Sequence, residues 1–316
     1  MLNFPKGINL FFFLLISLSP MLFGIGQNDD NKGYVFGASY MTMNNPFFIV
    51  LNEGIKDVVE ARGDKVIALD PALDQAKQII QIQDLIDQGV DVIFLNPVDW
   101  KGVRPALEAA RKARIPIINI DSPVYDSDMV VSIITSNNYN AGVLVAQDVL
   151  KRIGENAKVV LLEHPVTKSG LDRTQSFADT TKNMPGIEII ARENANGQLE
   201  QAMPAMEQII RDHLEFDVVM GTNDPTVMGA LAALKVAGRE KGVLIYGVDG
   251  SPDAKKMVKE GKITATVAQS PMGIGRTAAE VAYKLLAGED IEKEILVPVE
   301  LIDSSNVDNF GLDGWQ

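Results

Sequence analysis

Residues 33–48 read GYVFGASYMTMNNPFF, an apolar run followed by a polar turn and two adjacent aromatic residues. The run has the length of a strand, and Asn45 and Pro46 have the residue types preferred at a helix N-cap and at the first helical position. Successive helical residues point about 100° apart, so Phe47 is expected to face the core and Phe48 the open end of the strand. The stretch is interpreted as one wall of a ligand pocket. The alternative is a capped helix with two core aromatics.

From residue 34 onward, short apolar runs alternate with longer segments of helical periodicity, a pattern typical of parallel strands joined by helices. Strands are expected at 65–69, 90–95, 116–120, 130–134, 158–162, 187–191, 217–221, 243–247, 262–267 and 295–301. Helices are expected at 74–88, 103–113, 141–153, 173–182, 199–212, 226–237, 252–260 and 273–286. This is about twice the content of one doubly wound sheet, so the pattern predicts an α/β fold with two doubly wound, parallel-sheet lobes.

The composition excludes several classes of site and partner. A chain of 316 residues is long enough for two domains, and its net charge of −13 repels nucleic acid and anionic membranes. Because the chain has no cysteine, disulfides, thiolate nucleophiles and cysteine-based metal sites are absent. His164 and His213 are far apart in the sequence, so a catalytic or zinc site centred on histidine is not expected. We expect no metal and no cofactor.

The N-terminus has the pattern of a secretory signal peptide. Lys6 precedes an apolar run at 8–23, and Gly24-Ile25-Gly26 is a small-x-small cleavage motif, so residues 1–26 are expected to be removed on export to the periplasm. Residues 27–32 then form a polar linker. A retained membrane anchor is the alternative, because the apolar run is close to spanning length.

Polar residues follow many of the predicted strands. Because the carboxyl ends of parallel strands share one edge, these side chains converge where ligands bind in open α/β sheets. They are Asn45, Asp70, Asn96, Asp121, Glu163, Asn223 and Asp249. Asp and Asn also cap the helices that follow strands, and we assign Asp70, Asn96 and Glu163 to capping. For the other four, capping and ligand binding both remain open.

Several motifs, taken together and in this order, resemble the periplasmic sugar-binding proteins of ABC importers, most closely the ribose-binding type. The resemblance covers nearly all of the chain after residue 33. The motifs are MNNPFF at 43–48, INID at 118–121, DRTQSF at 172–177, GTNDPTVMGALAAL at 221–234, YGVDGSPD at 246–253 and ATVAQSP at 265–271.

The resemblance implies two lobes that a three-crossing hinge joins and that close on the ligand. The crossings are expected near Thr135 to Asn137, near Gln269 to Ser270, and near Leu301. The first lobe would comprise 33–136 and 270–300, and the second 137–269 and 301–316. Ligand-binding roles carry over by motif position to Asn45, Phe47, Phe48 and Asp121 in the first lobe and to Arg173, Asn223, Asp249 and Gln269 in the second.

Three positions depart from the ribose-type pattern, so the sugar is not expected to be ribose by default. Met41 stands where that type has a small hydroxyl residue, Ser122 where it has an arginine, and Gly197 where it has an aromatic stacker. The pocket should therefore be roomier and less cationic. Trp100 could supply an aromatic surface, although a half-buried tryptophan at a helix start is the favoured explanation.

The resemblance implies a monomer that binds a monosaccharide or polyol, delivers it to an ABC permease and performs no catalysis. A sensor that presents the sugar to a chemoreceptor or histidine kinase is an alternative with the same pocket. An enzyme is a further alternative, with Asp121 and Asp249 as paired carboxylates. The sequence contains no nucleophile elbow, phosphate loop or dinucleotide fingerprint to support it.

Overall fold

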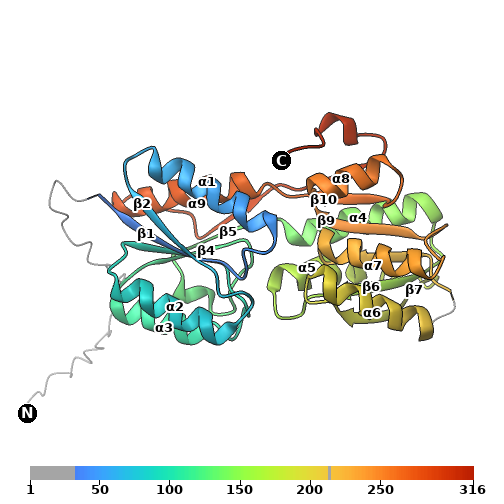
Figure 1. Ribbon diagram of the computed structural model, residues 1–316, viewed down its shortest axis with the longest axis horizontal. Helices are drawn as coiled ribbons and strands as arrows, with labels where there is room; N and C mark the ends of the chain where they lie inside the picture. Colours follow the sequence, from blue (N-terminus) through green and yellow to red (C-terminus); the bar gives the residue numbers. More distant parts are fainter. Residues whose placement is uncertain (1–32, 213–214) are drawn as a thin grey trace, which may run out of the picture.

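The computed structural model describes residues 33–212 and 215–316. They form two lobes side by side, each with a six-stranded sheet between helices (Figure 1). The predicted α/β fold with two doubly wound lobes is therefore confirmed. The leader expected at 1–26 and the linker expected at 27–32 lie outside the described residues. Within the described ranges, no helix is both long and apolar enough to cross a membrane.

The first sheet has the strand order β11-β5-β4-β3-β1-β2, and neighbouring strands pair in parallel. Its strands are β1 (Val35–Ser39), β2 (Lys65–Leu69), β3 (Val92–Leu95), β4 (Ile117–Ile120), β5 (Ser132–Ser136) and β11 (Glu294–Val297). Its helices are α1 (Pro46–Glu60), α2 (Gln75–Asp87), α3 (Arg104–Ala113) and α9 (Pro271–Leu286), with a 3₁₀ turn, η1, at Ser127–Met129. Helices α1 and α9 cover one face, and α2 and α3 cover the other (Figure 1).

The period of two in a strand separates the cores on the two faces of this sheet. On β3, Val92 and Phe94 belong to the core under α1 and α9, whereas Ile93 and Leu95 belong to the core under α2 and α3. A strand covered on both faces needs apolar residues at every position. This explains why VIFL is a continuous apolar run rather than an alternating one.

The second sheet has the order β12-β10-β9-β8-β6-β7, and its pairings are parallel except for the antiparallel edge pair β10–β12. Its strands are β6 (Ala157–Glu163), β7 (Ile187–Asn194), β8 (Val218–Gly221), β9 (Leu244–Asp249), β10 (Ala265–Ala268) and β12 (Glu300–Asp303). Its helices are α4 (Asn138–Ile153), α5 (Lys168–Thr181), α6 (Leu199–Asp212), α7 (Asp224–Val236) and α8 (Pro252–Lys259), with a 3₁₀ turn, η2, at Val307–Asn309. Helices α4 and α5 share one core, and α6, α7 and α8 share the other.

The chain passes between the sheets three times, at residue 137, at 269–270 and at 298–299. The single strand expected at 295–301 is wrong. Pro298 interrupts the apolar pattern and has no N–H to donate to a sheet, so the segment divides into β11 in the first sheet and β12 in the second.

Two of the expected helix caps are also wrong. Asp70 accepts from the backbone N–H of Ala72 (2.7 Å) in a local turn, and the N-cap of α2 is Asp74, which accepts from Lys77 N (2.9 Å). Glu163 is the last residue of β6 and pairs with Arg192 instead of capping a helix.

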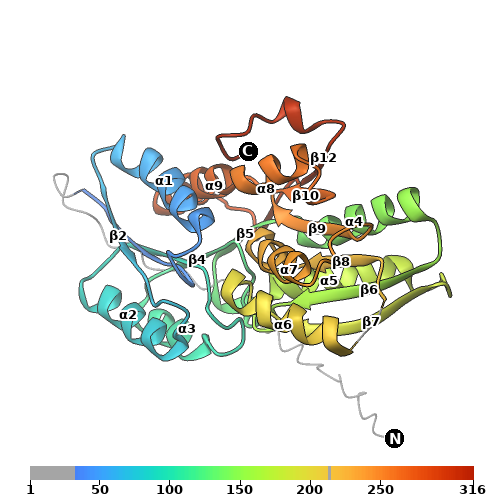
Figure 2. The same ribbon diagram turned by 45° about the vertical axis from the view of Figure 1, so that its right-hand side comes forward.

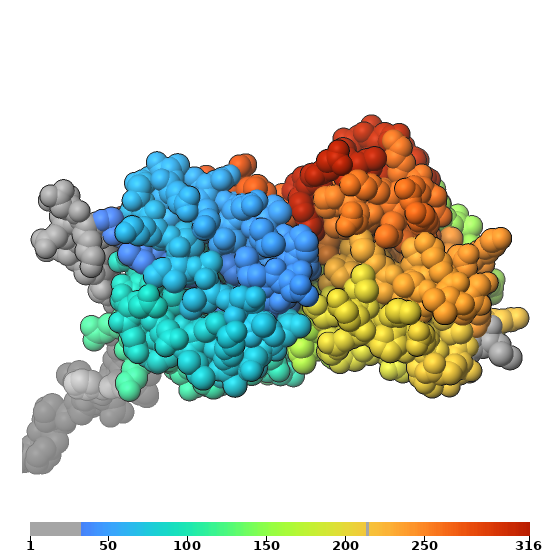
Figure 3. Space-filling model, viewed as in Figure 1, coloured from blue at the N-terminus to red at the C-terminus, as the bar shows by residue number. Residues whose placement is uncertain are grey.

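The C-terminal segment runs from the second lobe toward the first. The buried amine of Lys255 donates to the carbonyls of Phe310 (3.4 Å) and Gly314 (2.6 Å), which holds the segment against α8. Trp315 then packs edge-on against Phe47 of α1, with ring centroids 5.7 Å apart. The turned view and the space-filling view place this segment beside the seam between the lobes (Figures 2 and 3).

Helices α1 and α9, which are far apart in the sequence, pack at a contact that two glycines make possible. A Cβ on Gly275 would lie 2.1 Å from the carbonyl oxygen of Leu51, and one on Gly54 would lie 2.5 Å from that of Met272. Gly275→Ala should therefore force the helices apart and lower the free energy of unfolding by about 1–3 kcal/mol, the usual cost of overpacking. Urea unfolding monitored by circular dichroism measures this.

Gly314→Ala is the matched control, because no atom lies within 4 Å of a Cβ built there. It should change stability by less than about 0.5 kcal/mol. Equal unfolding midpoints for the two variants would contradict the proposed close contact.

Candidate ligand-binding site

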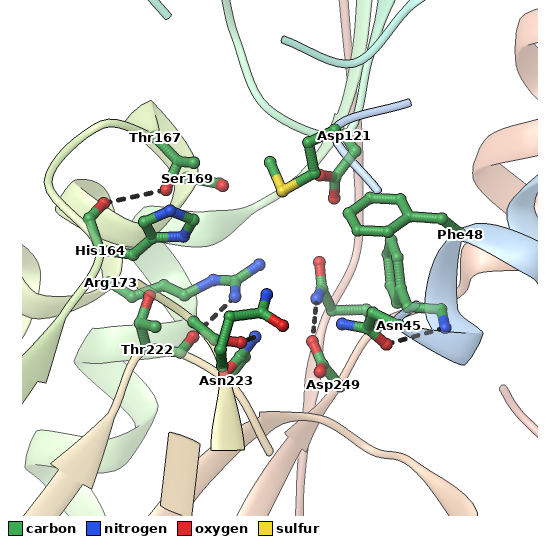
Figure 4. A pocket seen from close by; sticks show the side chains of 15 residues that line it. Asn45, Phe48, Asp121, His164, Thr167, Ser169, Arg173, Thr222, Asn223 and Asp249 are labelled. Carbon is green, nitrogen blue, oxygen red and sulfur yellow. Dashed lines mark hydrogen bonds between the residues drawn. The ribbon is translucent and has the colours of Figure 1, made fainter. Parts of the chain in front are cut away.

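A cavity of about 440 Å³, partly open to solvent, lies between the lobes at the carboxyl ends of the parallel strands. This size suits one small ligand. Its lining comprises Met41, Asn45, Phe47, Phe48, Asp121, His164, Thr167, Ser169, Arg173, Gly197, Gln198, Thr222, Asn223, Asp249 and Gln269. All eight residues that the resemblance assigned to ligand binding are among them. Figure 4 labels all of these except Phe47 and Gln269 and shows them converging from both lobes.

The first turn of α1 supplies the aromatic wall. Asn45 caps the helix by accepting from Phe47 N (3.0 Å), which fixes both aromatic residues in place. Phe47 belongs to the core and Phe48 lines the cavity, as expected, but the expected division between them is wrong because each ring does both. Both rings are buried, both line the cavity, and they contact each other edge to face at 5.3 Å. Trp315 packs against Phe47 and adds to the apolar surroundings of this ring beside the cavity.

Asp121 follows β4 and is held by Asn96, which follows β3. Asn96 is fully buried; its Nδ2 donates to Asp121 Oδ2 (2.9 Å), and its Oδ1 accepts from Met41 N (2.9 Å). The assignment of Asn96 to helix capping is therefore wrong, and its role is to orient the carboxylate. Burial raises the pKa of Asp121 to about 6, against the lowering effects of Arg173 and of the Asn96 hydrogen bond.

Arg173 enters the cavity from α5, which begins at Lys168 rather than near Arg173 because Thr167 caps it. Arg173 is 5% exposed, and its guanidinium donates from Nε to Asn138 Oδ1 (2.8 Å) and from Nη1 to the carbonyl of Thr222 (2.7 Å). Both acceptors are neutral, so the side chain is rigidly placed while its charge remains available to a ligand.

Asp249, at the end of β9, and Gln269, after β10, form a pair. Gln269 Nε2 donates to Asp249 Oδ1 (2.8 Å), whereas Asp249 Oδ2 and Gln269 Oε1 are buried without a hydrogen-bond partner among the described residues. Burial, reinforced by the nearby carboxylate of Asp224, raises the pKa of Asp249 well above its usual range. When Asp249 is ionised, the pair presents two acceptors that a ligand can satisfy.

Asn223 both caps α7 and lines the cavity. Its Oδ1 accepts from Thr226 N (3.1 Å), and its Nδ2 donates to the carbonyl of Gly197 (3.0 Å). Asn45 likewise caps a helix and lines the cavity. At these two positions, the capping and ligand-binding interpretations are compatible.

His164 is the principal lining residue that the sequence reasoning missed. The strand was predicted to end at residue 162, but β6 continues through Glu163, so the first residue after the strand is His164. A prediction one residue longer would have placed His164 among the strand-end residues. A Cβ on Gly197 would lie 3.0 Å from His164 Nδ1, so the imidazole occupies the space that a larger residue at 197 would need. Burial and the charge of Arg173 lower the pKa of His164 to about 4, so the ring is neutral at physiological pH. The other missed lining residues are Thr167, Ser169, Gln198 and Thr222.

Four residues were named with the departures from the ribose-type pattern, and in the structure two of them line the cavity and two do not. Met41 and Gly197 line the cavity. Ser122 lies outside the lining, and its Oγ accepts from Ser169 N (3.3 Å) of the other lobe. Trp100 also lies outside, because its backbone N–H donates to the carbonyl of Val166 (3.0 Å) and its ring packs on Tyr125.

The comparisons with known proteins place this fold and site in a family. A model of the periplasmic binding protein domain matches residues 36–290. The ribose import binding protein of Bacillus subtilis (strain 168) is 32% identical over 296 residues, covering 93% of this chain and 95% of the relative. The putative rhizopine-binding protein of Rhizobium meliloti is 31% identical over 282 residues, covering 87% and 91%.

Among solved structures, an ABC transporter solute-binding protein from Bacillus halodurans C-125 with bound myo-inositol superposes with a TM-score of 0.84 at 26% identity, covering 90% of this chain and 99% of that one. One from Mycobacterium smegmatis with bound glycerol gives 0.83 at 28% identity, covering 90% and 100%. With two α/β lobes and one cavity between them, this chain belongs to the periplasmic binding protein family and has its type I fold.

Proposed function

We propose that this protein captures a monosaccharide or a related polyol between its lobes and delivers it to the permease of an ABC importer. The observation that carries the proposal is the division of the cavity into an aromatic wall, Phe47 and Phe48, and a polar wall built around Arg173 and Asp249. Aromatic faces pack against the C–H face of a sugar, and charged and amide groups bind its hydroxyls. The relatives named for ribose import and the neighbour with bound myo-inositol support this class of ligand.

Closure of the lobes completes the site. Asn45, Phe48 and Asp121 come from one lobe and Arg173 and Asp249 from the other, so a ligand that contacts all of them joins the two. Two hydrogen bonds between the lobes, Ser169 N to Ser122 Oγ (3.3 Å) and Trp100 N to Val166 O (3.0 Å), support a closed arrangement. Hinge closure around a ligand is an established mode of domain motion.

A thermal-shift screen over pentoses, hexoses, deoxysugars and sugar alcohols, followed by calorimetry of the hits, tests the proposal. A ligand that binds the folded state raises the melting temperature by mass action. Analysis of the same mixtures for turnover tests the enzymatic alternative. Stabilisation without product formation is the expected result, and no stabilisation by any sugar or polyol would overturn the proposal.

We further propose that the protein is exported, loses residues 1–26 and acts as a monomer in the periplasm. The small-x-small motif before residue 27 and the relatives' role in import support this. Delivery to a chemoreceptor or histidine kinase would use the same closed form, and a pull-down of the sugar-loaded protein distinguishes the two routes. Sequencing the N-terminus of the exported protein tests the cleavage site.

Replacing Arg173 by alanine should weaken binding strongly. The guanidinium is buried, and its removal leaves ligand oxygens unpaired in a cavity with little access to water. We expect Arg173→Ala to cost roughly 2–4 kcal/mol of binding free energy, about 30-fold to 1000-fold in affinity. Titration calorimetry with the best ligand from the screen measures this.

Arg211→Ala is the matched control, because Arg211 is exposed in the last turn of α6, outside the cavity. It should bind within about twofold of the unmodified protein. Melting curves without ligand ensure that the Arg173 variant is folded. Normal affinity in a folded Arg173→Ala protein would mean that the ligand does not bind here.

Binding should weaken as the pH falls through about 6. The pKa of Asp121 is raised to about 6, and ligand hydroxyls donate to its ionised form, so protons compete with the ligand below that pH. Asn96→Ala removes a hydrogen bond that lowers this pKa, so its loss of affinity should begin at a higher pH. Calorimetry between pH 5 and 8 measures both profiles. Asp121→Asn should lose the part of the profile centred near 6, and an unchanged profile would contradict the role of Asp121.

A further inference from the structure

The charges of the cavity do not balance when both of its carboxyl groups are ionised. Among the lining residues, Asp121 and Asp249 are carboxylates, and Arg173 is the one residue with a permanent positive charge. His164 adds none, because burial keeps its imidazole neutral. With both carboxyl groups ionised, the cavity therefore has a net charge of minus one.

The residues behind the lining do not correct this imbalance. Asp224 is fully buried behind Asp249, accepting from Ser251 N (2.8 Å) and Thr266 Oγ1 (2.7 Å). Lys255 is the nearby cation, but its amine donates to the carbonyls that hold the C-terminal segment. The negative charge of Asp224 and the positive charge of Lys255 cancel, so the net charge in and around the cavity remains minus one when the carboxyl groups are ionised.

The residue after Asp121 explains the missing positive charge, because the ribose-type pattern has an arginine at this position. Residue 122 is a serine, and its hydroxyl is used in the contact with Ser169 rather than in the cavity. Arg173, the remaining cation, contacts two neutral acceptors and influences both carboxyl groups only at a distance. Burying an unpaired charge is expensive, and this cost raises the pKa of Asp249. A ligand that supplies a positive charge would offset the cost and allow the carboxyl group to ionise.

The unsatisfied atoms show where such a charge would be placed. Asp249 Oδ2 and Gln269 Oε1 are both acceptors, both buried and both without a partner among the described residues. Figure 4 shows Asp249 at the lower edge of the cavity, between Asn223 and Asn45. A primary ammonium group has three donors and no acceptor, which matches adjacent free acceptors better than a hydroxyl does.

We propose that the preferred ligand is an amino sugar or amino polyol whose ammonium group binds Asp249 and Gln269. This inference rests on the proposed function and specifies its class of ligand. The hydroxyl groups of the same ligand are left for Arg173 and Asp121. The raised pKa of Asp249 agrees with the proposal. Burial and the carboxylates of Asp224 and Asp121 raise this pKa against the lowering effects of Arg173 and of the Gln269 hydrogen bond, so an ammonium group bound beside Asp249 would favour its ionised form.

The test compares matched pairs of compounds at pH 7: D-glucosamine with D-glucose, 3-amino-3-deoxy-D-ribose with D-ribose, and 1-amino-1-deoxy-myo-inositol with myo-inositol. In the pair with the best fit, calorimetry should give at least a tenfold higher affinity for the amine. Binding of the amine should also release protons as the carboxyl group ionises, seen as a dependence of the heat on the ionisation enthalpy of the buffer.

Asp249→Asn keeps the size of the side chain and removes the charge, so the preference for the amine should fall to within about threefold. Asp253→Asn makes the same change of charge at an exposed position on α8 and should retain the full preference.

Three results would decide against the proposal. Neutral compounds that bind as tightly as their amines in every pair would overturn it and leave the proposed function intact. A folded Asp249→Asn protein that retains the full preference would overturn the assignment of the ammonium to this residue. No binding by any compound, charged or neutral, would overturn the proposed function as well.

Discussion

The site depends on one constraint of parallel sheets, which is that all strands end at the same edge. In each lobe this edge faces the other lobe, so the residues that follow the strands meet across one seam. The chain must then turn abruptly to enter the next helix or loop. Asp121 has a backbone φ of +62° and Asp249 a φ of +146°, values that residues other than glycine rarely adopt. The two carboxylates are therefore held at positions of backbone strain, as is common where a protein binds ligands.

The cost of burying charge explains the residues around these carboxylates. Asn96 and Gln269 each donate to one carboxylate oxygen and leave the other without that bond. Arg173 is similarly fixed by neutral acceptors, Asn138 and Thr222. Each charged group is thus held by bonds that do not neutralise it. This arrangement preorganises the cavity, since its polar groups need little rearrangement when a ligand arrives.

The alternation of strands and helices was predictable because buried parallel strands are continuous apolar runs. The bounds of the edge strand at 65–69 and of the helix at 199–212 were predicted to the residue. Local pattern was insufficient where two roles share a residue type. Asn96 is of a residue type that often caps helices, yet its side chain donates a hydrogen bond to Asp121, a residue distant in sequence. His164 was missed because β6 extends to Glu163, and the strand at 295–301 was wrong because Pro298 divides it between sheets. The ligand-binding positions came from motif resemblance, since spacing alone does not place two lobes.

The substitutions at 122 and 197 change the site in related ways. The resemblance implies that serine at 122 stands in place of a cation in the first lobe and that glycine at 197 stands in place of an aromatic residue in the second. The neutral imidazole of His164 lies beside Gly197. Aromatic contact is then concentrated on Phe47 and Phe48, in one lobe only. The second lobe must recognise its ligand chiefly through hydrogen bonds and charge. Those interactions depend on direction and protonation more than apolar contact does. The second lobe would therefore be the part that selects among the proposed polyhydroxylated ligands.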